Sequence, residues 1–253
     1  MALVSLKEHR ILVTGAARGL GLSIATALAS AGADVVMADI LEEEGKKATA
    51  ALAATGAKVK FIVVDLADPN SIEALIKAAS GGDGKLDGLV NNGAIATGIG
   101  GINLDEIEID VWDRIMQVNV RGTWLMTKNA APYLAASGRG RIVNVASDTA
   151  LWGAPRLLAY VASKGAVISM TRSLARELGP QQIGVTCVAP GILKTWSTEY
   201  VPEARHQLYE QGRAVPGPQA PEAITGTIAF LLTPEALTLT GQVMPVNNGF
   251  VFT

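Results

Sequence analysis

Short apolar runs alternate along the chain with longer segments in which apolar residues recur at helical spacing. Runs of consecutive apolar positions, such as Val35-Val36-Met37-Ala38, are typical of strands that are buried on both faces of a parallel sheet. The pattern predicts seven strands, which are Ile11–Thr14, Asp34–Asp39, Lys58–Val64, Gly88–Asn91, Arg141–Ala146, Gly184–Ala189 and Gln242–Val246.

The longer segments between these strands predict helices. Pro69 suits a first helical turn, while Gly32, Gly56 and Gly179 mark helix ends. The predicted helices are Gly19–Ala31, Glu42–Ala54, Pro69–Ala79, Ile109–Leu134, Arg156–Leu178 and Pro221–Leu232. Strands and helices that alternate without a linker predict a single α/β domain over residues 1–253, with about seven strands in a parallel sheet.

Residues 191–219 interrupt this alternation. The segment has no strand pattern, and it contains several prolines, including Pro202, and the aromatic residues Trp196 and Tyr200. A long irregular stretch inside a compact domain is usually functional, so we expect a lid over a binding site. An ordinary surface excursion is the alternative.

Composition and charge narrow the class of protein. The chain has 253 residues, 49% of them hydrophobic, and a net charge of −2 from scattered residues of both signs. Such a chain can bury one large core, and its charge argues against nucleic-acid and membrane partners. The sequence has no apolar run of about twenty residues and no signal-peptide pattern at its start. The single cysteine, Cys187, fits a buried position in a reducing compartment, so we expect a cytoplasmic protein.

The first predicted strand runs directly into a glycine-rich turn, Gly15-Ala16-Ala17-Arg18-Gly19-Leu20-Gly21, and then into a helix. Glycines there allow a tight turn and a close approach of the backbone to a pyrophosphate, which rests on the amides at the helix N-terminus. A glycine pattern alone is a weak signal, but this one opens an alternating β/α chain. It predicts dinucleotide binding and therefore a Rossmann-type, doubly wound sheet.

An acidic residue, Asp39, ends the second predicted strand, and another, Asp65, directly follows the third. Asp39, eighteen positions after Gly21, can accept hydrogen bonds from the adenosine ribose and would repel a 2′-phosphate, which favours NAD over NADP. Arg18 in the turn is the opposing signal, because a guanidinium can bind a phosphate. Asp65, followed by Leu66, can contact the adenine, and a simple strand-end cap is its alternative.

A tyrosine and a lysine four positions apart are the candidate chemistry. Tyr160 and Lys164 would share one face of a helix, and we expect the ammonium to lower the pKa of the phenol from about 10. Such a phenol can transfer a proton near neutral pH. Ser147, thirteen positions earlier, can hold a substrate oxygen within its reach. A packed tyrosine beside a solvated lysine is the alternative for the pair alone.

With these motifs, the chain resembles the short-chain dehydrogenases/reductases, an NAD(P)-dependent family, along essentially its whole length. The matching motifs are Thr14-Gly15-x-x-x-Gly19-x-Gly21, Asp65-Leu66, Asn91-Asn92-Gly93-Ala94, Asn119, Ser147, Tyr160-x-x-x-Lys164 and Pro190-Gly191-x-x-x-Thr195. Seven motifs in the right order and at the right spacing make a chance match untenable.

The resemblance implies a role for each matched residue. Tyr160 corresponds to the catalytic acid/base, Ser147 to the group that binds the substrate oxygen, and Lys164 to the residue that holds the nicotinamide ribose. Asn119 matches the asparagine that positions a water in the proton relay, with a helix cap or kink as its alternative. Implied cofactor contacts are Gly15, Arg18, Gly19, Leu20, Gly21, Asn92, Tyr160, Lys164, Pro190, Gly191, Ile192 and Thr195. The resemblance also implies a homotetramer formed through the two long helices.

Three positions depart from the usual family pattern. Gly93-Ala94 stand in reversed order, so that the conformational freedom of glycine moves one residue earlier. Asn247-Asn248-Gly249 replace the usual Asp-Gly-Gly. Asp148 places a carboxylate directly after the catalytic serine. We expect Asp148 to be solvated or to cap a helix, with selection of a polar substrate group as the alternative.

These features predict an NAD-dependent oxidoreductase, without a metal ion, that interconverts a secondary alcohol and its ketone. The candidate substrate-pocket residues are Ile95, Asp148, Trp152, Trp196 and Tyr200. The apolar and aromatic members favour a hydrophobic or cyclic substrate, although the aromatic residues also suit a core or a subunit interface. The alternative functions are an NADP-dependent carbonyl reductase, an epimerase or dehydratase, and a nucleotide sensor of the same family.

Overall fold

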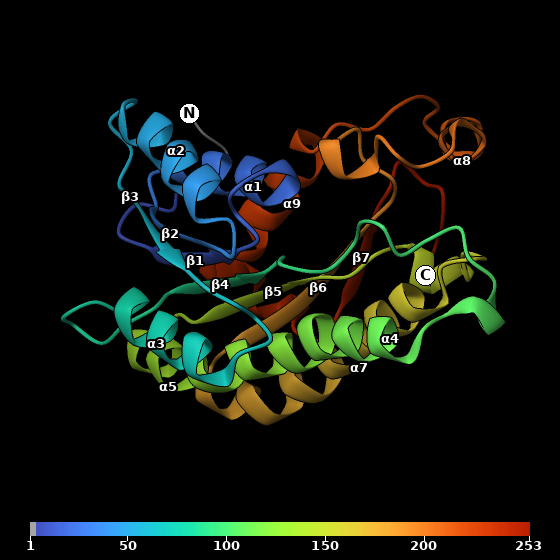
Figure 1. The fold of residues 1–253 in the computed structure, drawn as a ribbon. Helices are drawn as coiled ribbons and strands as arrows, with labels where there is room; N and C mark the ends of the chain where they lie inside the picture. Colours follow the sequence, from blue (N-terminus) through green and yellow to red (C-terminus); the bar gives the residue numbers. More distant parts are fainter. Residues whose placement is uncertain (1–3) are drawn as a thin grey trace.

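The computed structural model describes residues 4–253 and contains one sheet of seven parallel strands. The order across the sheet is β3-β2-β1-β4-β5-β6-β7 (Figure 1). Each strand matches its prediction to within one residue at either end. The strands are β1 (Arg10–Thr14), β2 (Asp34–Asp39), β3 (Val59–Val63), β4 (Gly88–Asn91), β5 (Arg141–Val145), β6 (Gly184–Pro190) and β7 (Val243–Val246).

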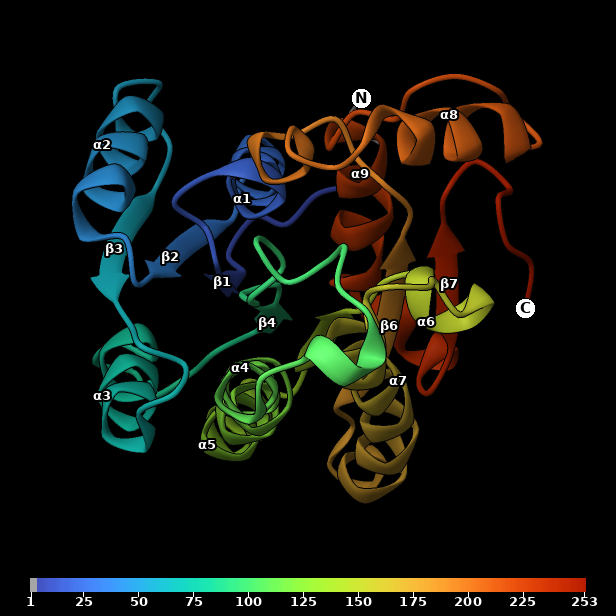
Figure 2. The ribbon, with the colours of Figure 1, turned by 45° about the vertical axis from the view of Figure 1, so that its right-hand side comes forward.

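Helices cover both faces of the sheet, as a doubly wound parallel sheet requires (Figures 1 and 2). One layer holds α1 (Gly19–Ser30), α2 (Glu42–Ala53) and α9 (Glu222–Leu231). The opposite layer holds α3 (Pro69–Ala79), α5 (Thr123–Ser137) and α7 (Leu158–Leu178). The prediction of a Rossmann-type α/β fold is therefore confirmed. Within residues 4–253, no helix combines the length and the apolar character needed to cross a membrane.

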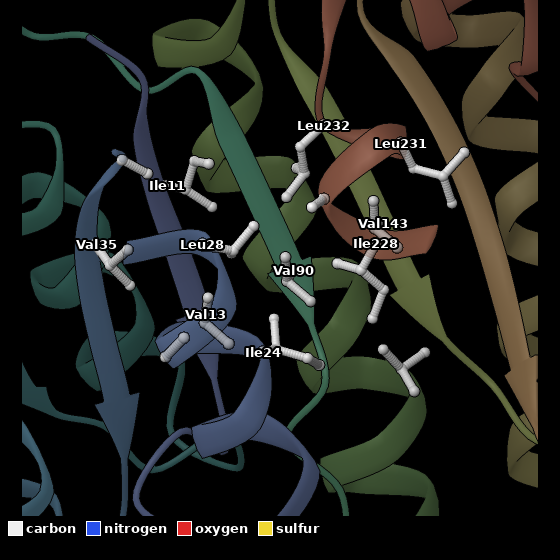
Figure 3. Packing of buried hydrophobic residues seen from close by; sticks show 14 of the residues in the cluster. Ile11, Val13, Ile24, Leu28, Val35, Val90, Val143, Ile228, Leu231 and Leu232 are labelled. Carbon is white, nitrogen blue, oxygen red and sulfur yellow. The ribbon is translucent and has the colours of Figure 1, made fainter. Parts of the chain in front are cut away.

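The core forms two layers because successive strand residues point to opposite faces of the sheet. Ile11 and Val13 of β1 pack with Ile24 and Leu28 of α1, as Figure 3 shows. Leu12, between them, packs on the other face against α3 and α5. Continuous apolar runs are thus needed wherever a strand is covered on both sides.

The winding direction reverses between β1 and β4. β1 pairs with β2 on one side and with β4 on the other, so the loops that follow these strands diverge. Such a reversal opens a crevice outside the carboxyl ends of the strands, where ligands of open α/β sheets bind. The glycine-rich turn follows β1 and therefore lies at this crevice.

The predicted helix Ile109–Leu134 is interrupted. It consists of α4 (Ile109–Ile115), a π-helical segment (Met116–Gly122) and α5. A Cβ atom at Gly122 would lie 2.7 Å from the carbonyl oxygen of Leu66, so only glycine permits this packing. Apolar periodicity cannot reveal such a widened turn, because π-helical segments are short and local.

Residues 191–219 are more regular than predicted. They contain a short 3₁₀ turn (Trp196–Thr198) and α8 (Glu203–Gly212), which begins after Pro202. A proline before the helix and a glutamate in its first turn are helix-start signals that the prediction passed over. The remaining short helices are α6 (Thr149–Trp152) and 3₁₀ turns at Leu104–Glu106, Gly179–Gln181 and Pro234–Leu239.

Candidate active site

A cavity of about 920 Å³ opens at the carboxyl ends of the strands and is lined by both groups of predicted motifs. The nucleotide-turn residues and the serine, tyrosine and lysine therefore face one space. The predicted residues that line it are Gly15, Arg18, Gly19, Leu20, Gly21, Asp39, Asp65, Leu66, Asn92, Ile95, Ser147, Trp152, Tyr160, Lys164, Pro190, Gly191, Ile192, Thr195, Trp196 and Tyr200. Asn119 and Asp148 lie outside this lining.

The glycine-rich turn is packed so closely that side chains are excluded. Gly15 has a φ of +64°, and a Cβ atom at Gly21 would lie 1.9 Å from the Gly15 carbonyl oxygen. Arg18 at the N-terminus of α1 makes no side-chain cap, so the amides of the first helical turn are free to bind an anion. The turn thus suits a pyrophosphate.

Asn92 fastens this turn to the end of β4. Its side-chain amide donates hydrogen bonds to the carbonyl oxygens of Thr14 and Gly15, at 2.9 and 3.2 Å. The neighbouring Gly93 does not use the positive φ that we expected of it. The packing there favours glycine, because a Cβ atom would lie 2.8 Å from the Leu66 side chain and 3.2 Å from the Gly15 amide nitrogen.

Asp39 is held at the end of β2 by backbone amides. Its two carboxylate oxygens accept hydrogen bonds from the amides of Ala17 and Leu41, at 3.0 and 3.1 Å. The residue is 9% exposed and lines the cavity beside the glycine-rich turn. A negative charge is therefore fixed at this edge of the crevice.

Arg18 points toward the segment that follows β6. Its guanidinium carbon lies 3.7 Å from the centre of the Trp196 ring, a cation–π contact. Figure 2 shows this segment, in orange, reaching across to α1 before it returns to α8. Residues 191–219 thus contact the nucleotide turn directly.

Asp65 serves as the strand-end cap that we considered as its alternative role. One carboxylate oxygen accepts a hydrogen bond from the Ala67 amide at 2.8 Å, and Arg114 approaches the same oxygen to 3.7 Å. Asp65 and Leu66 also line the cavity, so capping and ligand contact are compatible.

Ser147, Tyr160 and Lys164 converge from β5 and α7. Ser147 follows the end of β5, is 8% exposed, and accepts a hydrogen bond from the Thr149 hydroxyl at 2.9 Å. Tyr160 and Lys164 lie one turn apart near the start of α7. The ammonium of Lys164 donates to the carbonyl oxygen of Val145 at 2.8 Å, which anchors it at the strand end.

The pKa of Tyr160 is not lowered as we expected. Burial raises the pKa of Tyr160 to about 12, the nearby Ser147 hydroxyl lowers it in part, and the charge of Asp148 raises it further. Burial also lowers the pKa of Lys164 to about 8, so the lysine stays largely charged at neutral pH and becomes neutral as the pH rises above 8. The expectation neglected desolvation, which disfavours both charged forms.

Asn119 lies in the π-helical segment and is 1% exposed. Its side chain accepts a hydrogen bond from the Ile95 amide at 2.8 Å and donates to the Ile95 carbonyl and the Ser163 hydroxyl, both at 3.1 Å. It therefore ties the loop after β4 to α7. The side chain is not a helix cap, but the residue does lie where the long predicted helix is interrupted, as the kink alternative implied.

The expectation that Asp148 is solvated is wrong, and although the residue stands at the N-cap position of α6, its side chain makes no capping hydrogen bond. It is 0% exposed, and it accepts hydrogen bonds from the Tyr209 hydroxyl at 2.7 Å and from the Asn247 side-chain amide at 3.1 Å. Two of the departures from the family pattern are thus bonded to each other. Asp148 is also absent from the cavity wall, which removes it from the substrate pocket.

The aromatic candidates do line the cavity. Trp152, Trp196 and Tyr200 all face it, and the Tyr200 hydroxyl donates to the Ala96 carbonyl oxygen at 2.9 Å. Sequence reasoning missed other wall residues, notably Tyr209 and Arg205 of α8. The helix-start signal at Pro202 could have drawn attention to both.

Comparison with known proteins finds related dehydrogenases and reductases that match almost the whole chain. A family model described as enoyl-(acyl carrier protein) reductase matches residues 15–251. A cyclopentanol dehydrogenase of Comamonas sp. is 34% identical over 246 residues, which cover 95% of this chain and 96% of that protein. A 3-alpha-(or 20-beta)-hydroxysteroid dehydrogenase of Mycobacterium bovis is 36% identical over 240 residues, covering 95% and 88% of the two chains.

A solved structure shares the fold and the sequence pattern. It is assigned as an NAD(P)-dependent gluconate 5-dehydrogenase from Beutenbergia cavernae, with NADP bound at low occupancy. The TM-score is 0.91 at 30% identity, with 97% of this chain and 98% of that chain covered. Together with the family match, the seven-stranded sheet and the motifs gathered around one cavity, this similarity shows that the chain belongs to the short-chain dehydrogenase/reductase family.

Proposed function

We propose that the protein is an NAD-dependent oxidoreductase that interconverts a secondary alcohol and its ketone. Membership of the family makes it a dehydrogenase or reductase, and the relatives support action on a secondary alcohol. The observation that carries the proposal is the common cavity, which places Ser147, Tyr160 and Lys164 in the same space as the glycine-rich turn.

The residues at the cavity fit an extended dinucleotide. The uncapped amides at the start of α1 would hold the pyrophosphate, and Asp39 would accept hydrogen bonds from the adenosine ribose. Asp65, Leu66 and Asn92 would flank the adenosine half. Lys164 and the residues Pro190, Gly191, Ile192 and Thr195 would flank the nicotinamide half.

The nicotinamide supplies the hydride chemistry when it is bound, and the protein supplies orientation and proton transfer. Ser147 and Tyr160 would hold the substrate oxygen between their hydroxyls. In ketone reduction the Tyr160 phenol donates its proton to that oxygen, and in alcohol oxidation the phenolate removes it. A pKa of Tyr160 raised to about 12 favours the protonated form, and therefore the acid role, at neutral pH.

Asp39 supports NAD as the preferred cofactor. Its carboxylate is fixed by two backbone amides at the place where a 2′-phosphate would sit, so the two negative charges would repel. An NADP-dependent carbonyl reductase is the second candidate. It is favoured by Arg18 and by the NADP in the related structure.

The substrate end of the cavity supports a hydrophobic or cyclic alcohol. Its walls include Ile95, Trp152 and Tyr200, which are apolar or aromatic, whereas Trp196 lies against Arg18 at the nucleotide turn. Two relatives are named for cyclopentanol and for hydroxysteroids, which are secondary alcohols that contain carbon rings. Arg156 and Arg205 also line the cavity, so a substrate with an anionic group is a useful comparison.

A nicotinamide absorbance assay tests the function directly. Cyclopentanol, cyclohexanol and hydroxysteroids, together with hydroxy acids of similar size, would be offered with NAD and with NADP at several pH values. We expect turnover of at least one ring alcohol with NAD. A pure nucleotide sensor would bind NADH without turnover, and an epimerase or dehydratase would convert substrate without net absorbance change.

Three further assignments belong to this proposal. We propose that residues 191–219 act as a lid, because Trp196 contacts Arg18 of the nucleotide turn.

A homotetramer through α5 and α7 agrees with the partly exposed Trp124 and Leu158 on these helices. A reducing, cytoplasmic setting agrees with the buried free thiol of Cys187. Light scattering of the purified protein would measure the oligomeric state.

A further inference from the structure

A buried hydrogen-bond chain connects the serine loop with α8 and with the C-terminal segment. One oxygen of Asp148 accepts a hydrogen bond from the Tyr209 hydroxyl at 2.7 Å, and the other accepts from the Asn247 amide at 3.1 Å. The Tyr209 hydroxyl accepts in turn from the indole N–H of Trp152 at 3.0 Å. Three segments far apart in the sequence therefore meet at one carboxylate.

The direction of each bond in this chain is determined by its neighbours. An indole N–H can only donate, so the Tyr209 hydroxyl must direct its own proton to Asp148. The Asn247 side-chain oxygen accepts from the amides of Gly249 and Phe250, at 3.1 and 3.2 Å, so its NH₂ group must face Asp148. Both oxygens of Asp148 must therefore accept, which an ionised carboxylate satisfies and a carboxamide does not.

Tight packing surrounds these bonds. The rings of Tyr209 and Phe250 stack with centres 4.2 Å apart, and the Trp152 ring meets both edge-on, at 6.2 and 5.8 Å. A Cβ atom at Gly191 would lie 2.9 Å from an Asp148 oxygen and 3.1 Å from the Tyr209 ring. The strand end that would flank the nicotinamide thus passes directly over the cluster.

We propose that Asp148 is a positioning residue, which joins α8 and the C-terminal segment to the serine loop and so sets the Trp152 and Tyr209 wall of the substrate end. The inference rests on the proposed function for its catalytic consequence. Arg213, just after α8, supports the same placement, because it donates to the Ile192 carbonyl oxygen at 2.7 Å. Without Asp148, Tyr209 and Asn247 would each lose a buried acceptor.

Charge around Asp148 is consistent with this role. Burial raises the pKa of Asp148 to about 6, while Tyr209, Asn247, Arg213 and Trp152 act to lower it. The carboxylate in turn raises the pKa of Tyr160. Burying this charge is costly, and its hydrogen bonds and the nearby guanidinium offset part of the cost.

Exchanging Asp148 and Asn247 for one another tests this proposal. Asp148→Asn sets one NH₂ group against another, and Asn247→Asp sets one carboxylate against another. The double variant restores one donor and one acceptor at each contact. Deuterium exchange of the α8 amides should accelerate on the order of tenfold in each single variant and return to within about threefold of wild type in the double variant.

Unchanged exchange in the single variants, or a double variant as fast as the singles, would overturn the proposal. Should Asp148→Asn fail to fold, Tyr209→Phe keeps the ring stack and removes only the hydroxyl. We expect it to accelerate α8 exchange severalfold, and exchange at the wild-type rate would equally overturn the proposal.

Steady-state kinetics provide a second readout. In the single variants, substrate KM should rise about tenfold while the NADH Kd stays constant, and KM should recover in the double variant. Absence of turnover by the wild-type protein would contradict the proposed function and leave the exchange result standing.

Discussion

The ammonium nitrogen of Lys164 lies 5.6 Å from the centre of the Tyr160 ring and is hydrogen-bonded to the carbonyl oxygen of Val145. Because Val145 ends β5 and Ser147 follows it closely, one strand end and one turn of α7 hold all three groups. The lysine is therefore anchored to the sheet, while the tyrosine lines the cavity. Burial is the main cause that raises the pKa of Tyr160, and the Ser147 hydroxyl lowers that pKa in part.

Tyr160→Phe should reduce kcat by about three orders of magnitude, because general acid–base catalysis typically contributes a factor of 10² to 10⁴. The NADH Kd, measured by calorimetry, should stay within about threefold of wild type. Tyr133→Phe on α5, outside the cavity wall, is the matched control and should be fully active. Near-normal activity of the Tyr160 variant would remove the tyrosine from the mechanism.

Alcohol oxidation should accelerate with pH, and ketone reduction should slow. Burial raises the pKa of Tyr160 to about 12, so the phenolate needed for oxidation becomes more abundant with each pH unit. Below the apparent pKa, kcat/KM for oxidation should rise up to about tenfold per unit. The rise should flatten above pH 8, where Lys164, whose pKa burial lowers to about 8, loses its charge. Profiles from pH 6 to 10 in both directions measure this, and a flat oxidation profile would argue against Tyr160 as the base.

The role of Asp39 in cofactor choice is better tested with an asparagine variant than with an alanine variant. Asp39→Ala would leave the amides of Ala17 and Leu41 without their acceptor, at a cost of about 1–3 kcal/mol for each buried group. Asp39→Asn removes the charge and keeps an acceptor for one of the two amides, so it disturbs the turn less than alanine does. Combined with Ile40→Arg at an exposed cavity residue, it should raise the NADP/NAD ratio of kcat/KM by on the order of tenfold or more. Ile40→Arg alone is the control, and an unchanged ratio in the double variant would exclude Asp39 as the discriminating residue.

Trp196→Ala should weaken NADH binding about two- to fivefold, since an exposed cation–π contact contributes about 0.5–1 kcal/mol. The stack of Arg18 on Trp196 holds residues 191–219 against the nucleotide turn, so its loss should open the cavity. Trp196→Phe keeps an aromatic face and should bind nearly as wild type. Calorimetric Kd values compare the three proteins. Equal affinities would show that the lid contact does not contribute to binding.

Asp148 should make the protein less stable as the pH rises through 6. Its pKa is raised by burial from 3.8 to about 6, so its contribution to stability is fully present below pH 3.8 and is lost above pH 6. The change amounts to about 3 kcal/mol at 1.36 kcal/mol per pKa unit. Urea unfolding at pH 4.5 and 7.5 should therefore show a larger deficit for Asp148→Asn at the lower pH. A deficit independent of pH would contradict the raised pKa.

Much of the fold followed from local patterns. The strands were predicted to within one residue, and the central ones are continuous apolar runs because a strand buried on both faces needs them. The nucleotide turn was equally accessible, since Gly15 and Gly21 stand where side chains cannot fit. The interruption at Asn119 was considered only as an alternative, as a cap or kink, and the helix α8 was missed. The π-helical segment is only about one turn long, and the start of α8 is marked only by its first residues. Apolar periodicity is judged over longer windows and does not detect such short features.

The sequence by itself determined the order of strands and helices, the nucleotide turn and the identity of the candidate catalytic groups, because each depends on residues close together in the chain. Only the tertiary structure decided the environment of those groups. Asp148 became a buried acceptor because Tyr209 and Asn247, from distant segments, donate to it. The pKa of Tyr160 rose because burial removes water from the phenol, and burial is a property of the assembled fold.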